Sequence, residues 1–152
     1  MGLDMYLTKK TYVKNWEHIT DKFQVSVKLN GEDHPSVQPE RIIYIDEQIM
    51  YWTKQNAIHN WFVRNCQEGE DDCREAYVTE DDLKKLADLC EIVLETKEGK
   101  LLPTTEGFFF GGTLYDEWYF KGVKETMETL REELSNCEKH DGEHLYYYQS
   151  SW

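Results

Sequence analysis

Two hydrophobic periodicities divide this chain, and together they limit the folds that it can adopt. The first residues, GLDMYL, alternate Leu3, Met5 and Leu7 with other side chains, which is typical of a half-buried strand. The last residues, HLYYYQSSW, are strand-like and aromatic, and the segments between the two ends contain three stretches of helical period. This order predicts an α+β domain with a small, mostly antiparallel sheet packed by about three helices, in which the terminal strands can pair.

The remaining elements follow from the same two patterns. Short alternating or β-branched stretches predict two further strands, at residues 23–29 and 41–45. Apolar residues at three- and four-residue steps predict helices over 47–66, after Thr79, and over 114–137. Thr79 and Thr113 each precede an aspartate by three residues, which favours both as helix N-caps. No linker or repeat divides the chain, so residues 1–152 are expected to form a single globular domain.

The charge of the chain limits its partners. Thirty acidic residues against seventeen basic ones leave a net charge of −13, which disfavours direct binding to nucleic acid or to a membrane. No apolar run is long enough to span a bilayer, and the first residues do not resemble a secretory signal. A cytoplasmic location with reduced cysteines is therefore expected. The acidity either keeps the protein soluble or suits a basic protein partner.

The stretch YWTKQNAIHNWFVRNC, residues 51–66, is the first candidate site. On a helix, Asn56 and His59 share one face with the aromatic side chain of Trp52. An amide and an imidazole on an aromatic face can bind a planar ligand by stacking and hydrogen bonding. The alternative is a core histidine that bonds a backbone carbonyl or a tyrosine, and for His59 alone this alternative is favoured, because buried polar groups are usually paired within the protein.

The stretch FFFGGTLYDEWYF, residues 108–120, is the second candidate site. Two glycines before a helix can expose amide groups to a phosphate, but Asp116 and Glu117 in the first turn would repel one. These carboxylates, beside Trp118, are better suited to hydroxyl groups, to an amine, or to a lysine or arginine of a partner. The alternative is ordinary acid enrichment at a helix start with aromatic core packing.

Neither a metal site nor a cofactor is expected from the spacing of the ligating residues. Cys66 and Cys73 lack the close pairing of zinc knuckles, and Cys90 and Cys137 lie on apolar helix faces, where a thiol acts as a small hydrophobe. The acidic run EGEDD does not match an EF-hand loop. No linear catalytic signature is present, so the catalytic residues are unknown and enzymatic activity stays open, because acid–base sites need no linear motif.

Several blocks of the sequence resemble a group of small bacterial and phage or prophage proteins. The blocks are MGLDMYL, YWTKQNAIHNWFV, DDC, LLPTTEGFFFG, YDEWY and YYYQSSW, and they cover nearly the whole chain. The resemblance transfers no established activity. It implies a phage or mobile-element setting, with the host cytoplasm as the location, in which small proteins often act on host machinery or defence systems. Because the blocks coincide with both candidate sites, Trp52, Asn56, His59, Asp116, Glu117 and Trp118 are expected to converge on one pocket.

Three functions remain open from the sequence, in the following order. The first is binding of a small polar or nucleotide-like ligand in that aromatic pocket, as in counter-defence; replacing His59 with alanine would then abolish binding with little change in melting temperature. The second is an acidic inhibitor that binds a basic host protein as a nucleic-acid mimic. The third is an acid–base enzyme that uses His59 with Asp116 or Glu117. The sequence determines neither the ligand nor the oligomeric state.

Overall fold

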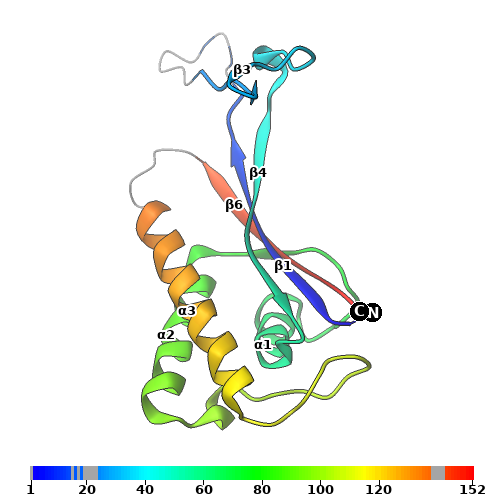
Figure 1. Cartoon of the computed structure of the whole chain (residues 1–152), viewed down its shortest axis with the longest axis vertical. Coiled ribbons are helices and arrows are strands. Elements are labelled where there is room, and N and C mark those ends of the chain that lie inside the picture. Colours follow the sequence, from blue (N-terminus) through cyan, green and yellow to red (C-terminus); the bar gives the residue numbers. More distant parts are fainter. Residues whose placement is uncertain (1, 15, 17, 19–23, 138–142) are drawn as a thin grey trace.

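The computed structural model describes residues 2–14, 16, 18, 24–137 and 143–152. In this part of the chain a four-stranded antiparallel sheet packs against three helices, which confirms the α+β class (Figure 1). The sheet order is β4-β1-β6-β5, with β1 Asp4–Tyr12, β4 Tyr44–Thr53, β5 Ala76–Val78 and β6 His144–Ser151. The helices are α1 Asn56–Cys66, α2 Glu80–Thr96 and α3 Glu117–Cys137. Shorter elements are the strands β2 Lys28–Leu29 and β3 Glu32–Asp33 and the 3₁₀ turns η1 Pro39–Arg41 and η2 Gly99–Leu101.

The two terminal strands form the centre of the sheet. β1 pairs antiparallel with β6 from Asp4 opposite Ser151 onward, so the two ends of the chain lie side by side (Figure 1). Alternate residues of both strands, such as Met5 and Tyr148, are fully buried against the helices, while their neighbours face the other side. The predicted pairing of the terminal strands is confirmed. One face of the sheet thus carries the core, as the alternation requires.

The prediction of a helix over residues 47–66 is wrong for the first part of this range. Tyr44–Thr53 forms β4, which pairs along β1, and α1 begins only at Asn56. Between them Lys54 adopts a left-handed backbone with φ 54°, and its amide donates to the Leu3 carbonyl at 2.8 Å. Pairing with β1 supplies backbone hydrogen bonds that residue spacing alone does not reveal, and this tertiary contact overrides the apparent helical period.

β1 and β4 extend away from the helices, and the chain beyond these two strands leads to the β2–β3 hairpin (Figure 1). The strand predicted over 23–29 is wrong for most of the described residues, since only Lys28 and Leu29 are in a strand. Phe23 and the preceding residues 19–22 lie outside the described residues. β5 was not predicted, because three residues are too short to show an alternation.

α3 is confirmed as a helix but begins later than the sequence predicts. Asp116, rather than Thr113, caps it, because the Asp116 carboxylate accepts a hydrogen bond from the Tyr119 amide at 3.0 Å. Trp118 is half exposed, whereas its neighbour Tyr119 is buried. Gly122 allows α3 to approach the chain before α1 closely, because a Cβ at this position would clash with the Gln55 side chain. Among the described residues, no helix is long and apolar enough to cross a membrane.

The predicted capping box at the start of α2 is confirmed and has a measurable consequence. The Thr79 hydroxyl accepts from the Asp82 amide, and the Asp82 carboxylate accepts from the Thr79 amide, both at 3.0 Å. Thr79→Ala is expected to lower the free energy of unfolding by about 1–2 kcal/mol, because it leaves an amide at the helix start without its partner. Urea unfolding measures the loss. Thr96→Ala, at the exposed end of the same helix, is the control, and equal losses in both variants would contradict the prediction.

Candidate functional site

His59 lies in a buried chain of side-chain hydrogen bonds. Its imidazole is 1% exposed, with Nδ1 2.6 Å from the Tyr148 hydroxyl and Nε2 2.8 Å from the Asp71 carboxylate. A carboxylate only accepts, so Nε2 donates to Asp71, and in the neutral ring Nδ1 then accepts from the phenol. Burial raises the pKa of Tyr148, which keeps its hydroxyl protonated and able to donate. Both ring nitrogens are therefore occupied within the protein, and the carboxylate at His59 is Asp71 rather than Asp116 or Glu117.

Asp71 connects three parts of the molecule. One carboxylate oxygen accepts from His59 on α1, and the other accepts from the Trp152 indole at 3.0 Å, next to the end of β6. Asp71 belongs to the acidic loop (residues 67–75), whose ends are closed by reciprocal bonds between Gln67 and Arg74. The EGEDD run is thus more than a solvated stretch, because Asp71 holds the acidic loop against α1 and the chain terminus.

Asn56 is the first residue of α1 and is buried, and its side chain holds the aromatic loop (residues 103–116). Its amide nitrogen donates to the carbonyls of Phe110 at 3.1 Å and Gly112 at 2.9 Å. Its amide oxygen accepts from the Thr105 backbone amide at 3.0 Å. One side chain therefore replaces the backbone partners that this irregular segment lacks, as buried peptide groups require.

Trp52 is buried within the sheet and helix core. Its indole nitrogen donates to the Thr126 hydroxyl of α3 at 2.8 Å, and its ring lies 5.8 Å from that of Phe62. Because these contacts enclose the ring, Trp52 is placed to join β4 to α3 and α1. Like His59, it is buried and does not line the cavity described next.

A cavity of about 100 Å³ opens where the start of α1, the aromatic loop and the start of α3 meet. Its lining includes Lys54, Gln55, Asn56, Thr104, Asp116 and Trp118. Of the six expected site residues, the structure brings three to this cavity: Asn56, Asp116 and Trp118. Glu117 is exposed beside it, whereas Trp52 and His59 lie in the core. Asn56 and Asp116 also have structural bonds, to the aromatic loop and to α3 respectively.

The aromatic loop exposes large apolar side chains, of which Leu114 also lines this cavity. Phe108 is 78% exposed and Leu114 is 74% exposed, and the partly exposed Phe109 ring lies 4.7 Å from that of Phe108. The residues are Phe108, Phe109, Leu114, Tyr115 and Trp118, which we call the aromatic surface. The sequence signal for this surface was the Phe run beside the glycine pair, but exposure could not be told from core packing before the loop was placed.

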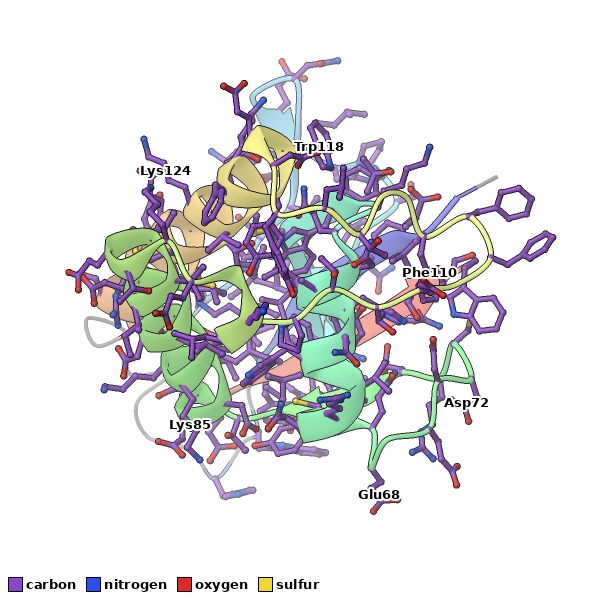
Figure 2. All side chains as sticks on the ribbon, turned by 90° about the horizontal axis from the view of Figure 1, so that it is seen from below. Glu68, Asp72, Lys85, Phe110, Trp118 and Lys124 are labelled. Atoms are coloured by element: carbon purple, nitrogen blue, oxygen red, sulfur yellow. The ribbon has the colours of Figure 1, made fainter. Side chains whose placement is uncertain are left out.

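The aromatic loop adjoins the acidic loop through Trp152. The Trp152 ring lies 6.0 Å from the buried Phe110 ring, while its indole bonds Asp71. Figure 2 shows Phe110 and Asp72, from the two loops, on one side of the molecule, with Lys85 and Lys124 of α2 and α3 on the other side. The acidic loop holds five acidic residues and one arginine, a net charge of −4. Apolar and acidic groups thus occupy neighbouring surface.

No family model matches this chain, and neither a curated protein nor a solved structure is significantly similar to it. The geometry of the described residues therefore carries the functional argument.

Proposed function

We propose that this chain is an interaction protein that binds a basic protein partner through the aromatic surface and the adjoining acidic loop. The observation that most supports this proposal is the exposure of several large apolar side chains on one loop, of which Phe108 and Leu114 are the most exposed. Contiguous exposed apolar side chains with a polar rim are typical of protein-binding sites. Aromatic side chains also contribute more binding free energy than most others at such interfaces.

The way in which the aromatic loop is held supports this function. Three hydrogen bonds from Asn56 define the path of residues 105–112, and Thr104 donates to the Thr113 carbonyl at 3.0 Å. A loop that is already ordered loses less conformational entropy when a partner binds, so more of the contact energy appears as affinity. These bonds lie beneath the exposed rings and leave them available for contact.

The charge of the surroundings supports a basic partner. The net charge of −13 and the acidic loop beside the aromatic surface complement a lysine- and arginine-rich surface. Such complementarity steers association and selects partners more than it adds affinity. A host protein that normally binds nucleic acid presents a surface of this kind, which agrees with the mimicry expected as one alternative from the sequence.

The size of the cavity argues against a nucleotide-like ligand. Sites for ligands of that size usually have volumes of about 300–1,000 Å³, whereas this cavity measures about 100 Å³. It accommodates the end of one side chain or a comparably small polar group. Within the proposed function, the cavity receives such a side chain from the partner, with Asp116 and Thr104 as its polar contacts.

Site-specific photo-crosslinking tests the position of the interface. A photoreactive phenylalanine analogue replaces Phe108 in one variant and Tyr44, an exposed aromatic at the start of β4, in the matched control. Expression in bacterial cells is expected to yield a defined protein adduct from position 108 but not from position 44. The same adducts at both positions, or none at position 108, would contradict the proposal.

Binding measured with the purified partner tests the proposed chemistry. Phe108→Ala combined with Leu114→Ser is expected to raise Kd at least about tenfold, because each truncation removes contact area at the centre of the interface. Because both positions are exposed, we expect the melting temperature of the double variant to be unchanged. Tyr44→Ala serves as the binding control. Raising the salt concentration should weaken binding, as expected between opposite charges. Salt-insensitive binding, or an acidic partner surface, would rule out a basic partner.

A further inference from the structure

Cys137 lies in a polar cluster, which corrects its assignment as a small hydrophobe on an apolar helix face. Its sulfur is 2.7 Å from the Tyr146 hydroxyl and 3.0 Å from the Glu133 carboxylate. The Lys9 ammonium, which pairs with Glu133 at 2.8 Å, also lies 3.3 Å from the sulfur. The side chain is nevertheless buried, with 7% of the residue exposed. Hydrophobic packing of a buried thiol does not require this many polar groups around the sulfur.

Three metal-ligating groups from distant segments meet at Cys137. Glu80 is the first residue of α2, Cys137 is the last of α3, and His144 is the first of β6. One carboxylate oxygen, the sulfur and one imidazole nitrogen all lie within 4.8 Å of one another. Glu80 and His144 are already in contact, with Nε2 2.6 Å from the carboxylate. Figure 1 shows the end of α3 near the beginning of β6.

We propose that Glu80, Cys137 and His144 form a zinc site with an open fourth position. Thiolate, imidazole and carboxylate are the ligands that Zn²⁺ uses, and three protein ligands with one open position are common for it. Calcium and magnesium select oxygen ligands, so the sulfur argues against them. The site rests on this convergence alone and is independent of the proposed function, whose residues lie on other parts of the fold.

The distances suit an ion after a small adjustment. Zinc–ligand bonds of about 2.0–2.3 Å in a tetrahedron place neighbouring ligand atoms roughly 3.3–3.6 Å apart. The sulfur and nitrogen come from side chains that are largely buried, with the His144 side chain 11% exposed. The Glu80 side chain is 57% exposed and can rotate to complete the site. The same exposure gives the ion a path from solvent.

The charges of the site and of its surroundings balance. On binding, the Cys137 thiol releases its proton to solvent, and the thiolate and the Glu80 carboxylate together neutralise Zn²⁺. The Lys9 ammonium contacts both the sulfur and the Glu133 carboxylate, and its positive charge offsets the repulsion between the thiolate and Glu133. Tyr146 supports two of the ligands, with its hydroxyl at the sulfur and its ring 5.3 Å from the His144 ring. Such outer contacts orient metal ligands and strengthen binding.

Cobalt and zinc titrations of the whole chain test the site. The protein, free of any histidine tag and kept reduced, is stripped with a chelator and titrated with Co²⁺ or Zn²⁺ alone. One equivalent of Co²⁺ is expected to give a near-ultraviolet sulfur-to-cobalt charge-transfer band. Cys137→Ser should remove this band, whereas Cys66→Ser, the same chemical change at a partly buried thiol elsewhere in the fold, should keep it. A missing band, or one that survives in Cys137→Ser, would overturn the proposal.

Two further variants separate ligation from a folding defect. Glu80→Gln and His144→Gln are each expected to raise the Kd for Zn²⁺ at least about tenfold, since changes to mere outer contacts already cost roughly 10–100-fold. Glu80 is exposed, so Glu80→Gln should fold normally, as circular dichroism can verify. Zn²⁺ should raise the melting temperature of the wild type but not that of Cys137→Ser. Equal Zn²⁺ affinity in wild type and Glu80→Gln would exclude the site.

Discussion

Replacing His59 with alanine is expected to lower the free energy of unfolding by about 3–5 kcal/mol. The ring is fully enclosed, so its removal leaves a cavity in the core. The Tyr148 hydroxyl, which is also buried, loses its 2.6 Å partner and is left unsatisfied. Asp71 loses its bond to α1, so the acidic loop is held less firmly. A loss of this size is a large fraction of the 5–15 kcal/mol that stabilises a typical domain.

Urea unfolding of four proteins measures this effect: wild type, His59→Ala, Tyr148→Phe and the double variant. Tyr148→Phe alone should cost about 1–3 kcal/mol, because it removes the hydroxyl and leaves a ring nitrogen without its donor. The double variant should lose less than the sum, since both changes break the same bond. His18→Ala, at an exposed histidine, is the control. A melting temperature unchanged by His59→Ala would instead favour the ligand-binding role for this residue.

Asn56→Ala is expected to cost about 2–4 kcal/mol and to loosen the aromatic loop. The change removes three hydrogen bonds at once and leaves the Thr105 amide and the carbonyls of Phe110 and Gly112 without their partner. Water entering from the adjoining cavity can form hydrogen bonds with some of these groups, which is the reason for the lower limit of the expected loss in stability. Because the loop presents the aromatic surface, we also expect weaker partner binding, even though Asn56 itself lies beneath that surface.

Hydrogen exchange with urea unfolding separates the local effect of Asn56→Ala from the global one. Amide protection should fall in residues 103–113 under conditions in which α2 and β6 remain protected. Asn60→Ala is the matched control, because it lies on the same helix but makes a single long bond, 3.4 Å, to the Pro103 carbonyl. If both variants lose equal stability and equal loop protection, the proposed role of Asn56 in holding the loop is wrong.

The parts of the fold that the sequence predicted are those with strong local periodicity. β1 alternates buried and partly exposed residues, and α2 combines a capping box with an apolar stripe, so each pattern matches a single element. The prediction for residues 47–53 was wrong for the opposite reason. It carries large apolar side chains at three-residue spacing and at alternate positions as well, so local pattern does not decide it. Pairing with β1 determined the strand.

The candidate site was partly predictable. Asn56 and His59 were recognised as unusual, because an amide and an imidazole share an apolar helical face. Their roles depend on Tyr148, Asp71 and the aromatic loop, which lie 12 to 89 residues away along the chain. No spacing rule connects residues so far apart. The sequence therefore suggested which side chains needed partners, but not which partners they have.

By itself the sequence determined the α+β class, the terminal strands, the helices α2 and α3, and the acidic character of the surface. These features depend on local propensity, periodicity and total charge, which are readable along the chain. The tertiary structure decided that His59 and Trp52 are buried, that Phe108 and Leu114 are exposed, and that Glu80, Cys137 and His144 meet. Burial and convergence depend on how distant segments pack, because contacts across the fold are set by the arrangement of whole elements.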